Sequence, residues 1–184
     1  MIRRALIVFL ILAAPLSGCT GTEDEHTMVP EFTVLKEDGG QITNSDYSGG
    51  AYVIVFSAQW CSNPCHNNLH NLNLSIPNIP VLVVSTDLDE APNGVTLSMW
   101  EDSVNEYDDD KELNQTLDYT FTRVNEAQNF ATQMNIDSPG TSIFVNAAGY
   151  EVHRQIGTFG DYNEQSTLDM IEMHWLAAES SMLH

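Results

Sequence analysis

Two continuous apolar runs near the middle of the chain predict strands that are buried on both faces. Residues 51–58 read AYVIVFSA and residues 80–86 read PVLVVST. Both runs are rich in β-branched and aromatic residues, and neither alternates between apolar and polar positions. This pattern is typical of the central strands of a sheet that has helices on both sides.

Two turn signals predict antiparallel hairpins at opposite ends of the chain. Residues 32–35 and 41–43 are short β-prone runs on either side of an Asp-Gly-Gly turn, and residues 141–146 and 150–156 flank an Ala-Ala-Gly turn. Short glycine-containing turns between such runs are the usual hairpin signal. A further β-prone segment, residues 118–124, predicts a short extra strand that the pattern does not place in the sheet.

Helical periodicity occurs in four segments that alternate with these strands. Apolar residues recur every three or four positions within residues 64–74, 97–104, 125–134 and 166–178. The order is therefore ββ, then βαβα, then αββα. Alternation of strands with helices predicts a parallel central part, and the hairpins add antiparallel strands. The predicted fold class is α/β, with a central mixed β-sheet flanked by helices and an N-terminal β-hairpin.

The start of the chain follows a different pattern, which predicts an export signal. Arg3 and Arg4 precede an apolar run at residues 5–16, and the sequence Leu-Ser-Gly-Cys ends at Cys19. An apolar run of about a dozen residues is too short to span a membrane stably but is typical of a signal peptide. Leu-Ser-Gly-Cys resembles the prokaryotic lipobox, in which the cysteine becomes the lipidated first residue of the mature protein.

This resemblance divides the chain into three parts. It implies a lipoprotein signal peptide at residues 1–18, a lipidated Cys19 with a flexible acidic tether at residues 19–29, and a folded domain at residues 30–184. The protein would then be anchored to a membrane outside the cytoplasm, in the periplasm or at the cell surface. An ordinary signal peptide that ends in Gly-Cys and an uncleaved anchor are the alternatives.

The charge of the chain narrows the range of partners. The chain has 6 basic and 26 acidic residues, a formal net charge of −20, and loss of Arg3 and Arg4 with the signal leaves −22. A surface this acidic is not built to bind nucleic acid or anionic lipid by charge. The acids are spread along the chain, which favours a solvated, self-repelling surface over an acidic docking face. The sequence does not indicate an oligomeric state.

Cys61 and Cys65 lie where the first buried run ends and a helix begins. Backbone N–H groups and the positive end of the helix dipole favour an anion there, so the pKa of a thiol at Cys61 is expected below its usual value of about 8.5. Pro64 suits the first helical turn because its missing N–H would have no partner there. Three residues separate the cysteines, so a disulfide requires the loop between them to adjust. Trp60 is expected to pack beside Cys61, to shield its thiol and to offer an apolar contact to a substrate.

A series of short motifs follows from Pro30 onward. These motifs are Pro30-Glu31-Phe32, Asp38-Gly39, Gly49-Gly50, Phe56 to Cys65 (FSAQWCSNPC) and Ser138 to Asn146 (SPGTSIFVN), followed by Gly149. Their order and spacing resemble the thioredoxin-like proteins of the TlpA type, which are membrane-tethered extracytoplasmic thiol-disulfide oxidoreductases. The resemblance implies a thioredoxin-like fold, partner proteins that carry thiols or disulfides, and no cofactor beyond the redox-active disulfide.

The resemblance also implies the role of each residue in the site. Cys61 is the attacking thiol, Cys65 is the resolving thiol, and Pro139 is a cis-proline that faces them. A cis bond before Pro139 would expose the backbone of Ser138, which could then pair with an extended substrate peptide. Together with the apolar surface expected from Trp60, Ser138 is the predicted substrate-binding element.

The sequence departs from the pattern of that family in several ways. One extra residue separates the cysteines, Val55 and Asn68 stand where such proteins have carboxylates, and Gly140 follows the proline. Both of the usual proton acceptors for a buried thiol are therefore missing. His66 and His70 are near enough in sequence to be candidates for proton transfer. The alternative is that these histidines lie on a solvated helical face.

Two other functions remain open. The spacing of the cysteines is that of the SCO-type proteins, which have the same fold and bind copper through two cysteines and a distal histidine. Two thiolates and an imidazole suit Cu(I). However, residues 137–140 contain no histidine, and alternation along the next strand points His153 away from the site. We therefore expect no metal, with copper as the alternative. The third hypothesis is a non-catalytic binding domain with a structural disulfide.

Overall fold

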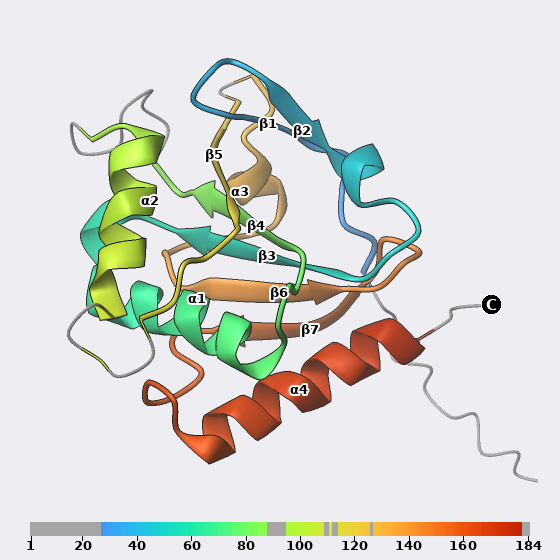
Figure 1. Ribbon diagram of the computed structural model, residues 1–184. Helices are drawn as coiled ribbons and strands as arrows, with labels where there is room; N and C mark the ends of the chain where they lie inside the picture. Colours follow the sequence, from blue (N-terminus) through green and yellow to red (C-terminus); the bar gives the residue numbers. More distant parts are fainter. Residues whose placement is uncertain (1–26, 88–94, 109–110, 112–113, 126, 182–184) are drawn as a thin grey trace, which may run out of the picture.

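The two continuous apolar runs form neighbouring parallel strands at the centre of a sheet (Figure 1). The computed structural model describes residues 27–87, 95–108, 111, 114–125 and 127–181. The two central strands, β3 (Tyr52–Ser57) and β4 (Val81–Ser85), are buried at every position. Apolar side chains on both faces of a strand need cover on both sides, and the helices provide it.

Among the described residues, seven strands form one sheet in the order β2-β1-β5-β4-β3-β6-β7. The bounds of the other five strands are Thr33–Leu35 (β1), Gln41–Thr43 (β2), Thr120–Val124 (β5), Thr141–Val145 (β6) and Glu151–Ile156 (β7). Strands β3, β4 and β5 are parallel, and the remaining pairs are antiparallel. The α/β class, the mixed sheet and the N-terminal hairpin are thus confirmed. The extra strand predicted within residues 118–124 is β5, which lies between β1 and β4.

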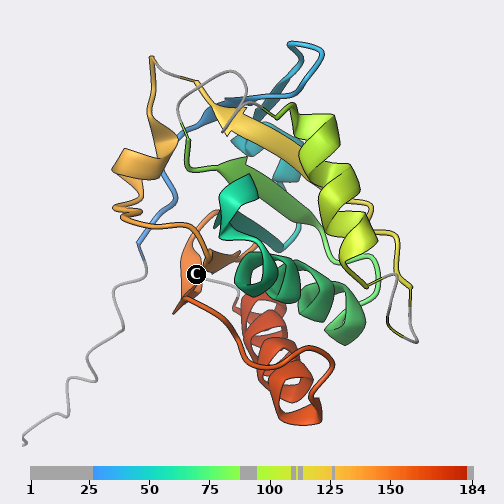
Figure 2. The same ribbon diagram turned by 90° about the vertical axis from the view of Figure 1, so that its left-hand side faces the viewer.

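The helices cover the two faces of the sheet unequally (Figure 2). Their bounds are Asn63–Ser75 (α1), Leu97–Asn105 (α2), Phe130–Gln133 (α3) and Gln165–Ser180 (α4). Because side chains alternate along a strand, Val53 and Val55 of β3 belong to the core beneath α1, α2 and α4, whereas Ile54 and Phe56 belong to the core beneath α3. The broad helical layer on the first face holds the start of α1, and therefore the cysteines, at the end of β3.

The helix predicted over residues 125–134 is wrong in extent, because only Phe130–Gln133 is helical. Two asparagine side chains explain the late start. The Oδ1 atom of Asn125 accepts a hydrogen bond from the N–H of Ala127 at 3.0 Å, and Oδ1 of Asn129 accepts one from the N–H of Thr132 at 3.2 Å. Such local bonds compete with helical backbone bonds, so the chain turns before the helix begins.

The predicted signal peptide (residues 1–18), the lipidation site Cys19 and most of the predicted tether lie outside the described residues. Within the described part of the chain, no helix has both the length and the apolar character that crossing a membrane requires.

Candidate active site

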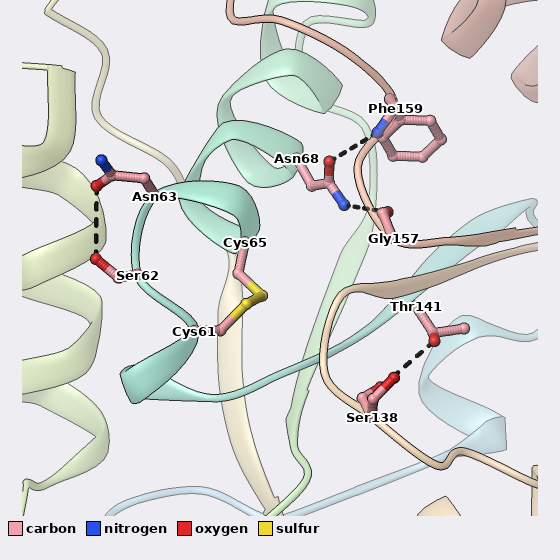
Figure 3. Close-up of a disulfide and its surroundings, with 9 residues drawn as sticks. All are labelled: Cys61, Ser62, Asn63, Cys65, Asn68, Ser138, Thr141, Gly157 and Phe159. Carbon is pink, nitrogen blue, oxygen red and sulfur yellow. Dashed lines mark hydrogen bonds between the residues drawn. A yellow bond between two sulfur atoms is a disulfide. The ribbon is translucent and has the colours of Figure 1, made fainter.

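A disulfide joins Cys61 and Cys65 at the carboxyl end of β3 (Figure 3). Cys61 is the last residue of a short 3-10 helix, Gln59–Cys61, and Cys65 is in the first turn of α1. The two Cα atoms are 5.7 Å apart, a usual separation for a disulfide. The loop adjusts as expected, because Ser62 adopts a non-helical conformation with φ of 53° and α1 starts only at Asn63.

The two sulfurs differ in their access to solvent. Cys65 is 1% exposed, whereas Cys61 is partly exposed at the surface. Pro64 occupies the first turn of α1, as predicted. An incoming thiolate therefore reaches Cys61 first, and the N-terminus of α1 stabilises a thiolate that forms there. This asymmetry suits a pair in which one cysteine exchanges with a partner and the other resolves.

Asn68 and Val55, the positions at which the resemblance implies carboxylates, carry uncharged side chains. Val55 is fully buried in β3. Asn68 is also fully buried, and its amide makes two hydrogen bonds: Nδ2 donates to the carbonyl of Gly157 at 2.9 Å, and Oδ1 accepts from the N–H of Phe159 at 3.0 Å (Figure 3). Asn68 is thus a structural link between α1 and the segment after β7.

Asn71 repeats this arrangement one turn further along α1. Its Nδ2 atom donates to the carbonyl of Asp161 at 3.1 Å, and its Oδ1 atom accepts from the N–H of Asn163 at 2.9 Å. The two buried amides fix residues 157–163 against the helix that carries Cys65. Sequence reasoning missed this function, although polar residues three apart on the inner face of a helix are a signal for it.

The segment Ser138–Gly140 faces the cysteines, but the predicted cis bond before Pro139 is wrong. All peptide bonds among the described residues are trans. The turn into β6 is made instead by Gly140, which has φ of +92° and donates its N–H to the carbonyl of Phe56 at 2.8 Å. A Cβ atom placed on Gly140 would lie 3.8 Å from Cys65 Sγ, so this segment adjoins the disulfide. The carbonyl of Ser138 accepts a long hydrogen bond, 3.5 Å, from Thr141 Oγ1.

Trp60 is 53% exposed, so it lies at the surface, and its shielding of the Cys61 thiol stays a prediction. Its Nε1 atom donates to Oδ1 of Asp87 at 3.3 Å, which fixes the indole at the end of β4. A groove of about 330 Å³ is lined by Trp60 and Asp87 together with Asp137, Ser138 and Pro139. The predicted substrate-binding residues Trp60 and Ser138 are therefore brought together in one groove.

The expectation that His66 and His70 could lie on a solvated face is wrong, since they are 5% and 0% exposed. His70 Nε2 lies 2.8 Å from the carbonyl of Val104, which places the proton on that nitrogen, and Nδ1 lies 3.5 Å from Oδ2 of Asp108. Burial lowers the pKa of His70, although Val104 and Asp108 oppose this effect. Both rings pack against Tyr107. They therefore face the segment after α2, whereas Cys65 and Asn68 face Gly140 and Gly157.

His66 is a neutral base held inside the protein. Burial, together with smaller contributions from the neighbouring His70 and Lys111, lowers its pKa from 6.5 to about 4. Its Nε2 atom is buried and has no hydrogen-bond partner among the described residues. A role in proton transfer for either histidine stays a prediction.

His153, the candidate copper ligand, lies away from the disulfide. Its ring stacks on that of His174 from α4, with centroids 3.4 Å apart, and both rings contact Phe144. In the described part of the chain, no group of three or more histidine, cysteine, aspartate or glutamate side chains is arranged to hold a metal ion.

Comparison with known proteins identifies the fold of this chain but does not assign the chain to a family. No family model matches the sequence, and no curated protein matches it. A Chlorobium tepidum protein, provisionally named thiol:disulfide interchange protein DsbE, is 17% identical, with a TM-score of 0.57 over 84% of this chain and 97% of that one. A thiol-disulfide oxidoreductase from Bacteroides fragilis is 20% identical, with a TM-score of 0.53 over 78% of this chain and 96% of that one.

A copper protein has the same fold. Yeast Sco1 with copper bound is 16% identical, with a TM-score of 0.56 over 85% of this chain and 98% of that one. The protein therefore has a thioredoxin-like fold, as its sequence predicted. Its similar structures include thiol-disulfide oxidoreductases and a protein that carries copper.

Proposed function

We propose that this protein is a thiol-disulfide oxidoreductase that exchanges disulfides with partner proteins through Cys61 and Cys65. The observation that carries the proposal is the unequal exposure of the two sulfurs at the start of α1, with Cys61 accessible and Cys65 buried. The thioredoxin-like fold and the similarity to thiol-disulfide oxidoreductases support it.

The exchange proceeds in two balanced steps when the reduced protein meets a partner disulfide. The Cys61 thiolate attacks one partner sulfur, a mixed disulfide forms, and the second partner sulfur leaves as a thiolate. Cys65 then loses its proton and attacks Cys61 Sγ, which releases the first partner sulfur and closes the Cys61–Cys65 bond. Two electrons pass to the partner, and the reverse sequence oxidises a partner dithiol.

The deprotonation of Cys65 is the step for which this site lacks the usual helper. Neither Val55 nor Asn68 can accept a proton, and the pKa of His66 is lowered to about 4 by burial. We propose that the proton leaves to solvent as Cys65 attacks the mixed disulfide, with His66 and His70 as the remaining candidates for a relay.

The location of this activity is also a proposal. The basic, apolar and Leu-Ser-Gly-Cys pattern of the first 19 residues supports export, lipidation at Cys19 and attachment to a membrane outside the cytoplasm. A disulfide between Cys61 and Cys65 persists in such an oxidising location.

The direct test uses the full chain with Cys19→Ser in detergent, so that Cys61 and Cys65 are its remaining cysteines. We expect the pair to equilibrate with glutathione buffers and Cys65→Ser to accumulate a mixed disulfide with a model protein substrate. Cys61→Ser is the matched control and should trap nothing. A pair that stays oxidised in every buffer, together with no trapped complex, would show that the protein is not an oxidoreductase.

A second candidate function is copper binding. The similarity to copper-bound yeast Sco1 and the shared three-residue spacing favour it. The reduced sulfurs of Cys61 and Cys65 would be soft ligands for Cu(I). Titration of the reduced protein with Cu(I) tests this function: stoichiometric binding that His153→Ala or His66→Ala abolishes, with no disulfide exchange, would replace the first proposal.

A further inference from the structure

The groove beside Trp60 starts at the redox disulfide. Trp60 directly precedes Cys61, and Pro139 directly precedes Gly140, next to which Cys65 Sγ lies. The groove between these two segments has a volume of about 330 Å³. A polypeptide that presents a cysteine to Cys61 therefore continues into this groove on the side of β4 and α3.

The charge of the groove has one sign. Among the described residues that line it, Asp87 and Asp137 carry carboxylates and none is a lysine or an arginine. Asp137 is exposed at the rim. The whole chain has a formal net charge of −20, so the electrostatic potential around the groove is negative as well.

Asp87 has an acceptor that the protein leaves unused. Its Oδ1 atom accepts from Trp60 Nε1 at 3.3 Å, whereas Oδ2 is buried and has no hydrogen-bond partner among the described residues. A carboxylate oxygen that is withdrawn from water without a donor is costly, and a cationic donor would relieve this cost. The exposed indole of Trp60 adds a flat apolar surface on which the stem of a lysine or the plane of an arginine can pack.

We propose that the groove selects extended polypeptide segments that carry lysine or arginine within a few residues of the reactive cysteine. Asp87 and Asp137 bind the cationic group, and Trp60 packs against its side chain. This inference rests on the proposed exchange activity, and it names the class of substrate: basic segments of partner proteins. Acidic segments are repelled at the same place.

The test compares three synthetic disulfide-linked peptide dimers that differ only in the residues beside cysteine, which are lysine, glutamine or glutamate. The full chain with Cys19→Ser is reduced, and its rate of exchange with each dimer is measured at low and high salt. Each rate is divided by that of dithiothreitol with the same peptide, which removes the intrinsic reactivity of the peptide. We expect the lysine peptide to react about tenfold faster than the glutamate peptide at low salt, and less so at high salt.

Variants separate the groove from the general field of the protein. Asp87→Asn and Asp137→Asn should each lower the lysine-to-glutamate ratio by about threefold. Glu179→Gln removes the same charge from an exposed position in the last turn of α4 and should leave the ratio unchanged. Asp137 is exposed, so its replacement stays informative even if Asp87→Asn does not fold.

The outcomes are distinct. The inference is overturned if the lysine-to-glutamate ratio of exchange rates is near one. It is also overturned if that ratio falls equally in Glu179→Gln and in the two groove variants. Either result leaves the oxidoreductase function intact. No exchange with any of the three peptides would instead overturn the proposed function itself.

Discussion

Ser62 is the residue that allows a disulfide to close across three intervening positions. Within a regular helix, positions four apart hold their Cβ atoms about 5–6 Å apart, which is too far for a disulfide. The φ of 53° at Ser62 takes Cys61 off the helical path before α1 begins. The extra residue that separates this sequence from the common dithiol motif is therefore absorbed by one unusual backbone conformation.

Gly140 is the corresponding residue on the opposite side of the site. Its φ of +92° suits glycine, whereas the space at its Cβ position is open enough for a methyl group, with Cys65 Sγ and Gly157 Cα both at 3.8 Å. We expect Gly140→Ala to lower the free energy of unfolding by about 1–2 kcal/mol through backbone strain alone. Urea denaturation measures this loss.

The matched control for that substitution is Gly50→Ala. Gly50 has no positive φ and nothing within 4 Å of its Cβ position, so its replacement should change the stability little. Equal losses of stability in the two variants would show that the positive φ of Gly140 causes no particular backbone strain in Gly140→Ala.

Single residues were predicted well where their role depends on neighbours in the sequence. Cys61, Cys65 and Pro64 were placed correctly because a strand end and a helix start are local patterns. The conformation of Pro139 was predicted wrongly because its expected cis bond came from a resemblance, and Gly140 makes the turn instead. The burial of His70 could not be predicted, since its partner Asp108 is distant in the sequence.

At the scale of elements, α1 is held on two sides by polar contacts as well as by its apolar face. Asn68 and Asn71 join it to residues 157–163. On its other side, His70 contacts Asp108 in the short 3-10 helix Glu106–Asp108 that follows α2. The helix that carries the cysteines is thereby fixed to both of its neighbours.

Asp108 anchors the segment after α2 and gives a prediction at this scale. It is fully buried, and its Oδ2 atom accepts hydrogen bonds from the Tyr162 hydroxyl at 3.1 Å and from the N–H of Gln115 at 2.9 Å. Asp108→Ala leaves these partly buried donors unpaired, so we expect a loss of about 3 kcal/mol in the free energy of unfolding. Chemical denaturation provides the measurement.

Glu106→Ala, at an exposed position of the same 3-10 helix, serves as the control and should cost little. If Asp108→Ala were as stable as this control, the buried contacts of Asp108 would not contribute to holding α1.

The strands and most helices were predictable because each has its own periodicity. The place of β5 between β1 and β4 was not, since strand order depends on pairing between distant segments. The helix over residues 125–134 was overestimated, because the side chains of Asn125 and Asn129 bond to nearby backbone and the apolar pattern does not reveal this.

For the whole molecule, the histidines set a pH dependence of stability. Burial lowers the pKa values of His66, His70, His153 and His174, and that of His66 falls from 6.5 to about 4. The unfolded chain therefore binds protons at a higher pH than the folded chain. As the pH falls from about 6.5 toward 4, the free energy of unfolding should decrease, with His66 contributing up to about 3 kcal/mol.

Urea denaturation at pH 7.0 and at pH 5.0 measures this effect, and His66→Gln is the matched variant. Glutamine does not titrate, so the variant should lose less stability between these two pH values than the parent protein does. The same loss in both proteins would show that His66 is not excluded from protonation by burial.

The uncharged side chains at positions 55 and 68 also affect how electrons and protons are coupled. In a site where a buried carboxylate titrates with the sulfurs, reduction changes the protonation of three groups together. Here neither Val55 nor Asn68 has an ionisable side chain, so these two positions add no titrating group to the two sulfurs. The midpoint potential should therefore follow pH as a two-electron couple governed by two thiol ionisations. A potential recorded across pH would report the acidity of Cys61 without a carboxylate contribution from these two positions.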